Sequence, residues 1–568
     1  MSLLGALNAG KTALAVQQAA IQVTGNNIAN AGNADYTRET VQLAPSAAQE
    51  IQSGVFLGTG VDLTGVQRQV DDALLSRMRQ SMSDNSAAGS TQQWLSQVES
   101  VFNALSGQDL SSHMSTFFND WSTLAGKPTD IGQRQIVLQD GQDLAGYLQN
   151  LKSQLGGLQS GIDDQIKGQA SAANDMAQKV ADLNRQIIVT EGGTAGQANG
   201  LRDQRDAVLK QLSQLMNIKT LEQPNGTVNV YVGSEPLVDG DTNHGVQLKM
   251  VPDATTGALV PNLTFKSNNG MIPVTSGQLG GLLDARNQIT GYSGQVDTIA
   301  HNLIFELNKL HASGQGLEGF SSVTATNQVL DPTVPLNQPA AGLPFTPVNG
   351  SLVVHVKQKA TGLVTSTLVN IDLDGLGGND TTLNSLAANL NGISGITANT
   401  NGNLLNIAAS SSAVEISFSQ DTSGALAALG INTFFSGKSA TDIALNQTIA
   451  GQPSLLAVAM NGNKADNQTA LAISQLETKT IPGLNGQSLK DNYQAVVNQI
   501  GTSAAAAKQN AQATQVVQDT LTSQQQALSG VSMDEEAVNL VRQQRAFQAA
   551  SRIVSAVDDM MKTIIQMV

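Results

Sequence analysis

Apolar residues near the start of the chain follow a seven-residue repeat. One heptad position holds only leucine and isoleucine, at Leu7, Leu14, Ile21 and Ile28. Neighbouring heptad positions are small or polar, as at Gly10 and Thr24. This spacing predicts an α-helix with one narrow apolar stripe. Because a helix takes most of its stability from packing its apolar face, such a helix needs a partner.

A second and stronger heptad pattern occupies the end of the chain. Ser532 and Glu535 have the spacing of a capping box, which predicts the start of a helix. Two interleaved apolar series follow, at Leu540, Phe547, Val554, Met561 and Val568, and at Ala550, Val557 and Ile564. Only Gln543 interrupts them. The same spacing upstream predicts a helix from 490 to 529, and Gly530 is expected to separate the two helices.

Between these ends, the pattern is first helical and then β-rich. Residues 70 to 220 have helical periodicity, with separate helices predicted at 136–158 and 162–188. They are expected to pack as helix hairpins, with a turn at Gly192–Gly193. The stretch NGTVNVYVG predicts a turn at Asn225–Gly226 followed by a strand.

Residues 321 to 445 differ from their surroundings, since prolines come first and short alternating segments follow. Strands are predicted at 351–356, 363–373, 403–408 and 413–418, with a helix at 382–390. A helix at 289–311 precedes this block. The block is therefore predicted to be an inserted α+β domain.

Together these patterns predict an α+β multidomain protein with a nested architecture. Terminal coiled-coil helices enclose a helical bundle shell, which encloses inserted β-rich domains. The predicted parts are an N-terminal axial helix and turn (1–60), a helical bundle domain (61–220), a β-rich segment with a closing helix (221–320), a variable α+β domain (321–445), return helices of the bundle (446–530) and a C-terminal axial coiled-coil helix (531–568).

Composition agrees with several domains and argues against some partners. A chain of 568 residues exceeds the size at which one core stops growing. Its net charge of −15 opposes binding to nucleic acid, which needs a basic surface. The absence of cysteine removes disulfides and thiolate metal sites. The longest apolar run, Leu455 to Met460, is far too short to span a membrane, and no cleavable secretory signal is visible.

Candidate chemistry is sparse. No pair of the five histidines has the spacing of a zinc motif, and no phosphate-binding loop or nucleophile elbow occurs. The stretch DLDGLGGND, at 372–380, offers oxygen ligands but lacks the full calcium-loop pattern, so a glycine turn is favoured. In LRDQRD, at 201–206, interleaved charges predict a salt-bridged helix face. We therefore predict no enzyme, cofactor or metal site.

One motif is more specific. After the first helix come Asn26, Asn27, Ile28, Ala29, Asn30, Asn33, Tyr36, Thr37 and Arg38. This arrangement resembles the signature of the rod, hook and hook-associated axial proteins of the bacterial flagellum. Within that group the chain is similar to the hook-associated protein 1 family, with the matching stretches at 199–215, 277–292, 421–437 and 529–560. The family's usual proline and glycine are replaced by Ala34 and Asp35. The asparagines are expected to end the helix by bonding back to the backbone and accepting left-handed conformations.

The resemblance implies a structural adaptor at the junction of hook and filament. Such proteins are exported through the flagellar type III apparatus, pair their terminal helices into an inner tube and expose their outer domains. The implied partners are copies of the chain in a ring-like layer, hook protein, a second junction protein (hook-associated protein 3) and an export chaperone on the C-terminal helix. The expected inner contacts are Leu7, Leu14, Ile21, Ile28, Leu540, Phe547, Val554, Met561 and Val568.

Two alternatives remain open at this point. A hook or rod protein would share the terminal motif, although the long helical block at 70–220 speaks against it. An adhesin or an enzyme could be grafted into residues 321–445, but no aromatic platform for a glycan is visible there.

Overall fold

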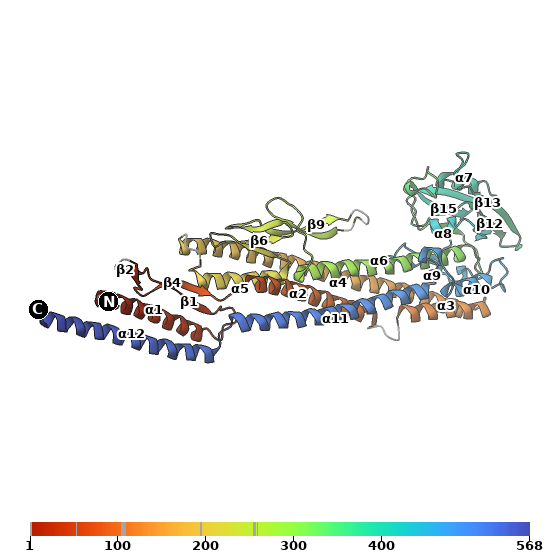
Figure 1. Cartoon of the computed structure of the whole chain (residues 1–568). Helices are drawn as coiled ribbons and strands as arrows, with labels where there is room; N and C mark the ends of the chain where they lie inside the picture. The colour runs from red at the N-terminus through yellow and green to blue at the C-terminus, as the bar shows by residue number, and fades with distance from the viewer. Residues whose placement is uncertain are drawn as a thin grey trace. The chain divides into compact units, whose positions relative to one another are not determined.

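The chain folds into two compact units, each assembled from segments far apart in the sequence. The computed structural model describes residues 3–52, 54–103, 109–192, 196–253, 257 and 259–567 (Figure 1). Unit 1 comprises residues 1–94, 161–286 and 505–568, and unit 2 comprises 95–160 and 287–504. Because unit 2 lies within the sequence of unit 1, the nested α+β architecture expected from the sequence is confirmed.

Four long helices contribute residues to both units. They are α2 (Asp72–Asn103), α4 (Ile131–Glu191), α6 (Gly277–Ala312) and α11 (Leu489–Ser529). The side chain of Asp130 begins α4 by accepting hydrogen bonds from the backbone nitrogens of Gly132 and Gln133. The prediction of separate helices at 136–158 and 162–188 is wrong, because α4 is continuous. Glycine between them lowers helix propensity by only about 1 kcal/mol, which packing overrides.

Unit 1 also contains the first and last helices, α1 (Leu3–Ala29) and α12 (Met533–Met567), and the short helix α5 (Asn199–Leu215). Two small antiparallel ribbons follow α1. They are formed by β1 (Glu39–Pro45) with β4 (Val61–Arg68), and by β2 (Gln49–Gln52) with β3 (Val55–Leu57).

The β-rich part of unit 1 begins where the sequence predicts it. Gly226 has φ +84°, as a turn before a strand requires, and β6 (Val228–Val232) follows. A four-stranded sheet has the order β5 (Lys219–Glu222), β6, β7 (Glu235–Asp239), β8 (Thr242–Asn243). A separate ribbon pairs β9 (Val246–Pro252) with β10 (Leu259–Phe265).

Unit 2 combines helices with two three-stranded sheets. One sheet has the order β13 (Val364–Ile371), β12 (Gly350–Gln358), β16 (Val414–Ser419). The other has the order β11 (Ser322–Thr324), β15 (Leu404–Ala409), β14 (Ile396–Asn401). A small ribbon pairs β17 (Phe435–Ser436) with β18 (Ala444–Leu445). The strands predicted within residues 321–445 are therefore confirmed.

The remaining helices of unit 2 are short. They are α3 (Leu110–Gly126), α7 (Leu383–Asn391), α8 (Ala425–Leu429), α9 (Gln447–Gly451) and α10 (Gln468–Ser474), with single 3-10 turns at 339–341, 453–455, 475–477 and 482–484. Aromatic rings of Phe117 and Trp121 on α3 pack against Phe434 in the core. No helix among the described residues is both long and apolar enough to cross a membrane.

The turn after α1 differs from the sequence-based expectation. Described residues with positive φ include none between 30 and 36, so the asparagines do not adopt the left-handed conformation. Two successive backbone turns close the segment instead, with Asn33 N donating to Asn30 O and Tyr36 N donating to Asn33 O. The side chain of Asn33 accepts a hydrogen bond from Asp35 N at 3.1 Å. Ala34 and Asp35 are therefore accommodated without strain.

Candidate assembly surface

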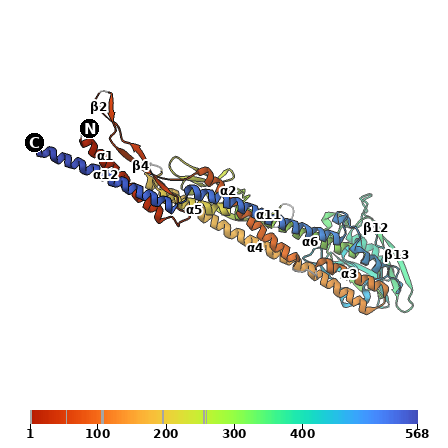
Figure 2. The same ribbon diagram turned by 60° about the horizontal axis from the view of Figure 1, so that its bottom comes forward.

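The first and last helices pack side by side in antiparallel directions (Figure 2). Three contacts define their alignment: Gly10 lies against Val554, Thr24 Oγ1 donates to Gln543 Oε1 at 2.9 Å, and Asn27 Nδ2 donates to Glu536 Oε2 at 3.0 Å. Residue numbers in these contacts rise along α1 as they fall along α12, so the two helices are antiparallel. The pair is therefore formed mainly through small and polar residues of α1.

Gly10 allows the helices to approach closely. A Cβ atom at this position would lie 2.8 Å from Val554 Cγ2, which is shorter than a van der Waals contact. The γ-carbons of a valine in a helix have one strongly preferred rotamer, so Val554 has little freedom to yield. Glycine at position 10 is thus explained by packing between the two helices.

Asn27 joins α1, the following turn and α12. Its Oδ1 accepts hydrogen bonds from Tyr36 OH at 2.8 Å and from Glu39 N at 3.0 Å. Its Nδ2 donates to Glu39 O at 2.9 Å and to Glu536. The side chain is 1% exposed, and all four of its hydrogen-bonding positions are used. Aspartate has no amide donor and could not replace it.

Glu536 is the charged centre of this junction. It is 2% exposed, and its Oε1 lies 2.7 Å from Arg38 Nη2. Arg38 also pairs with the Glu535 carboxylate at 3.0 Å. The backbone nitrogen of Glu535 lies 3.5 Å from Ser532 Oγ. One arginine thereby links the start of β1 to the first turn of α12.

The segment that links α1 to β1 is also attached to α5. Thr37 N donates to Asp203 Oδ2 at 3.2 Å, and Arg68 lies 2.8 Å from both Asp203 and Asp206. Burial is the largest cause that raises the pKa of Tyr36 above its usual value, and the negative charges of Glu39, Asp203 and Glu536 raise it further. Tyr36 therefore stays neutral and acts as a hydrogen-bond donor.

The charges of LRDQRD are paired as expected, but not along a solvent-facing surface. Arg202, Asp203 and Arg205 are all buried. Arg202 pairs with Glu191 at 2.8 Å, and although burial raises the pKa of Glu191, hydrogen bonds from Arg202 and Ala198 N lower it to about 2. The partners come from other elements, since Glu191 ends α4 and Arg68 ends β4, so the ion pairs are not formed along α5 alone.

None of the predicted inner contacts that the structure describes is fully buried in the single chain. Leu7, Leu14, Ile21 and Ile28 are half-buried, as are Leu540, Phe547, Val554 and Met561. Val568 lies outside the described residues. The fully buried residues of the pair are Gly10, Val16, Ala20, Thr24 and Asn27 on α1, and Glu536, Ala550 and Val557 on α12. The role of the predicted set in assembly stays a prediction.

The motif residues, by contrast, differ in burial. Asn27 and Arg38 contact Glu536, and Tyr36 bonds to Asn27. Asn26 is exposed, and its carbonyl accepts a hydrogen bond from Asn30 Nδ2. Sequence reasoning missed Glu536. A signal existed, because Glu536 stands at the same heptad position as Gln543, Ala550 and Val557, where a charged residue needs a buried partner.

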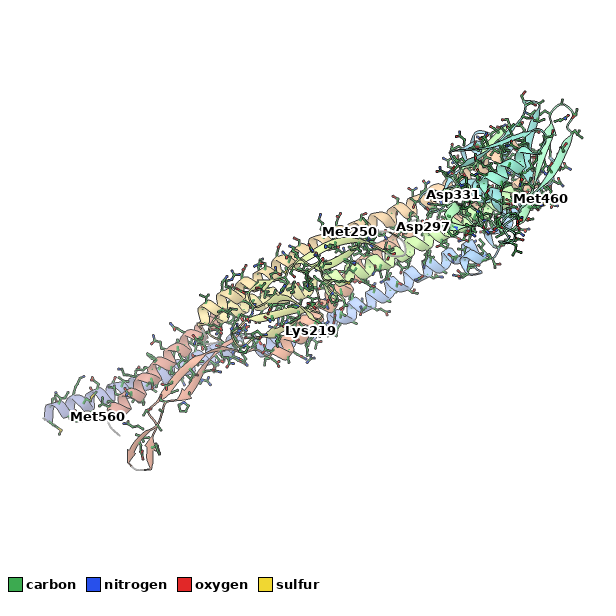
Figure 3. The ribbon with its side chains drawn as sticks, turned by 90° about the horizontal axis from the view of Figure 1, so that it is seen from above. Lys219, Met250, Asp297, Asp331, Met460 and Met560 are labelled. Atoms are coloured by element: carbon green, nitrogen blue, oxygen red, sulfur yellow. The ribbon has the colours of Figure 1, made fainter. Side chains whose placement is uncertain are left out.

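A second stripe on α12 is largely exposed in the single chain, although Ile553 borders α1, where a Cβ on Gly10 would lie 3.7 Å from Ile553 Cγ2. The stripe runs at alternating spacings of three and four residues through Ala546, Ala549, Ile553, Ala556 and Met560, and Met567 follows seven residues later, with Thr563 between them. Ile553 is 51% exposed and Met560 is 50% exposed. Figure 3 labels Met560 near the end of α12. This spacing is that of a second coiled-coil seam beside the one that faces α1.

The last turns of α12 are more exposed still. Ile565 and Met567 are 75% and 82% exposed. The register of the pair places Leu3, the first described residue of α1, near Met561, so this segment continues past α1. Large apolar side chains without cover are typical of interaction surfaces.

The acidic turn at 372–380 bonds mainly to itself. Asp374 Oδ1 accepts from Leu376 N, Asp380 Oδ1 accepts from Gly375 N, and Asp372 accepts from the Asn379 amide. Gly375, Gly377 and Gly378 have positive φ, as the predicted glycine turn requires. Asp372, Asp374 and Asp380 bring carboxylate oxygens within 4.8 Å of one another.

Comparison with known proteins agrees with these features. Residues 95–324 match the family described as flagellar hook-associated protein FlgK helical domain. Residues 524–567, which include α12, match the family described as flagellar basal body rod FlgEFG protein C-terminal.

Full-length relatives match over nearly the whole chain. Flagellar hook-associated protein 1 of Escherichia coli is 25% identical, over 98% of this chain and 99% of its own length. The protein of that name from Bacillus subtilis is 23% identical, over 98% and 97%. The solved hook junction protein FlgK from Burkholderia pseudomallei has a TM-score of 0.51 at 18% identity, covering 80% of this chain and 100% of that one.

The paired end helices and these matches define the class: the chain is a structural axial protein of the bacterial flagellum and not an enzyme. Within that class it is similar, over nearly its whole length, to hook-associated proteins of the FlgK type.

Proposed function

We propose that this chain is a structural adaptor that joins hook to filament and assembles with copies of itself through α1 and α12. The observation that carries the proposal is the uncovered seam of α12, centred on Ile553 and Met560. A helix with two heptad seams contacts two neighbours, and α1 covers one seam and only the edge of the other, at Ile553. The other seam is available to a neighbouring subunit in a ring-like layer.

The partners of the layer follow from its place in the flagellum. Hook protein would contact one side, and hook-associated protein 3 would contact the other. Before export through the type III apparatus, a chaperone would cover the exposed apolar residues of α12, which otherwise favour aggregation. The predicted contacts from Leu7 to Ile28, and from Leu540 to Val568, would face the interior of the assembled tube.

The domain assignments from the sequence remain part of this proposal. Residues 1–60 and 531–568 would form the axial core, and 61–220 with 446–530 would form the bundle around it. Residues 221–320 would close the bundle. Residues 321–445 would be the variable domain that faces solvent.

The test replaces one side chain of the uncovered seam. In cells lacking the native gene, a chain carrying Met560→Asp should be exported but should fail to support filaments, because a carboxylate cannot be buried between helices without a partner. The control is Met271→Asp, since Met271 is 68% exposed and lies outside both heptad seams.

Electron microscopy of cells and immunoblots of the medium provide the measurement. Met560→Asp cells should carry bare hooks and release filament protein, whereas Met271→Asp cells should carry normal filaments. Circular dichroism of the purified variants should show unchanged helix content, because Met560 contributes little to burial in the single chain. Normal filaments on Met560→Asp cells would contradict the proposal.

A further inference from the structure

The ribbon that follows α1 is only partly covered in the single chain. Every residue of β1 and β4 is exposed or half-buried. Both strands lie beside α1, and the approach is closest near Gly60, where an added Cβ would lie 2.4 Å from Thr12 Oγ1 and 3.2 Å from Ala9 Cα. An isolated two-stranded ribbon is marginally stable in water. The ribbon therefore gains stability if another surface covers it.

The outer end of this ribbon carries an aromatic ring beside a carboxylate. Phe56 on β3 is 64% exposed, and Glu50 on β2 stands directly opposite it in the antiparallel pairing. Directly paired residues project from the same face, so the ring and the carboxylate are neighbours. Figure 2 shows β2 extending away from α1 and α12. Glu50 Oε1 accepts one hydrogen bond, from Gly54 N at 3.0 Å.

A groove of complementary chemistry lies elsewhere in unit 1, between α2 and α11. Its volume is about 410 Å³, and its apolar wall includes Ala513, Val517 and Leu521. Val517 is 53% exposed although it lines the groove. Arg77 stands at its border, is exposed, and has no ion pair among the residues that the structure describes. The acidic residue of the groove, Asp84, accepts hydrogen bonds from Gln80 and Ser276.

We propose that the β2–β3 end of one copy docks into the α2–α11 groove of the next copy, with Phe56 against Val517 and Leu521 and Glu50 paired with Arg77. An unpaired cation beside an apolar groove matches an aromatic ring beside a carboxylate. The two surfaces are different parts of one chain, so the contact is heterologous. Heterologous contacts repeat around a ring or along a helix, whereas self-matching surfaces close into dimers.

The inference deepens the proposed self-assembly and rests on it. Contacts made by α12 would hold the centre of the layer together. The ribbon and groove would set the angle between neighbouring subunits farther from that centre. Docking would also cover a ribbon that has little cover of its own.

The absence of cysteine from the chain permits a direct test. Two copies with different tags are produced in the same cells, one carrying Phe56→Cys and the other Val517→Cys. Flagella are isolated and treated with a mild oxidant. A disulfide carrying both tags forms only between different molecules, and we expect it as the main cross-linked product. In the control, Val189→Cys replaces Val517→Cys, because Val189 is 77% exposed and lies on α4, away from the groove.

A charge exchange tests the ion pair. Glu50→Lys alone and Arg77→Glu alone should each reduce the mixed disulfide by about threefold, the size expected of an exposed pair. Combined in both copies, the two substitutions should restore it. A purely structural effect of either substitution would not be repaired by the other.

The possible outcomes separate the docking proposal from the proposed function. If flagella form but the mixed disulfide is no more abundant than in the Val189→Cys control, the docking proposal is wrong while the junction function stands. Docking is equally contradicted if Phe56→Cys copies join mainly to one another, or if the charge exchange restores nothing. If the cysteine-free chain is missing from isolated flagella, the proposed function itself fails.

Discussion

At the scale of single residues, His311 shows how burial fixes a protonation state. The ring is fully buried in unit 2, and its Nε2 accepts a hydrogen bond from Ala457 N at 3.0 Å. Nδ1 therefore carries the proton and donates to Asn432 O at 2.8 Å. Burial, opposed in part by that carbonyl, lowers the pKa of His311 to about 4. A second proton would have to displace the Ala457 hydrogen bond.

This arrangement predicts a loss of stability in acid. The pKa is about 6.5 in an unfolded chain and about 4 in the folded one, so the unfolded state binds more protons in this range. The stabilisation is complete above pH 6.5 and declines as the pH falls towards 4, by on the order of 3 kcal/mol. Denaturant unfolding of unit 2, followed by tryptophan fluorescence between these pH values, provides the measurement.

The control must account for Asp140, whose shifted pKa changes the stability with pH in the direction opposite to His311. Burial, with the hydrogen bond and charge of Asp120, raises the pKa of Asp140 to about 7. A raised carboxyl pKa adds stability at low pH and loses it as the pH rises towards 7. The comparison is therefore between Asp140→Asn and the double variant with His311→Gln. The double variant should be less stable near neutral pH and lose less stability in acid; equal slopes would contradict the assignment.

Asn27 also marks how much of the site the sequence could reveal. The motif named Asn27, Tyr36 and Arg38, and in the structure Tyr36 bonds to Asn27 while Asn27 and Arg38 both contact Glu536. Of the two expectations for the asparagines, bonding back to the local backbone is confirmed at Asn30 and Asn33, whereas the left-handed conformation is wrong, because none of them adopts it. An asparagine with all its hydrogen bonds satisfied by distant backbone and side chains cannot be distinguished in sequence from one that caps its own helix.

At the scale of elements, the apolar heptads locate the buried face of α12 but not that of α1. The heptads of α12 identify the series that contains its buried Ala550 and Val557. On α1 they identify leucines and isoleucines that are only half-buried, while the contacts with α12 come from Gly10, Thr24 and Asn27. A face made of small and polar residues gives no hydrophobic signal, so only the partner helix reveals it.

The close approach at Gly10 predicts a coupled pair of substitutions. Gly10→Val should weaken the packing of α1 on α12 by about 1–3 kcal/mol, because the added atoms overlap Val554. Hydrogen exchange of α1 amides in the purified chain would measure this as faster exchange. In the double variant Gly10→Ala, Val554→Ala, the α1 amides should exchange more slowly than the summed effects of the two single substitutions predict. Simple additivity would mean that the two positions do not touch.

At the scale of the whole molecule, each unit is held differently. The core of unit 2 contains fully buried Phe117, Trp121 and Phe434, so it has dense aromatic packing of its own. Within unit 1, α1 and α12 are joined by a glycine contact, one hydroxyl–amide bond and the hydrogen bond from Asn27 to Glu536, and Arg38, which follows α1, forms an ion pair with Glu536. A buried ion pair fixes geometry more effectively than it adds stability. Order at the paired helices is therefore expected to depend on neighbouring subunits.

That dependence predicts a gradient of hydrogen exchange along α12 in the dilute, unassembled chain. Amides near Ile565 and Met567, which extend past α1 and are largely exposed, should exchange fastest. Amides near Ala550 and Val557 should be intermediate, and those of α3, with Trp121 in the core, slowest. In isolated flagella the gradient along α12 should disappear, because packing between subunits would cover both seams at once. Exchange at the two ends of α12 that is equally slow in the dilute chain would mean that the single molecule already stabilises the helix, and the exposed seam would then have no energetic need of a neighbour.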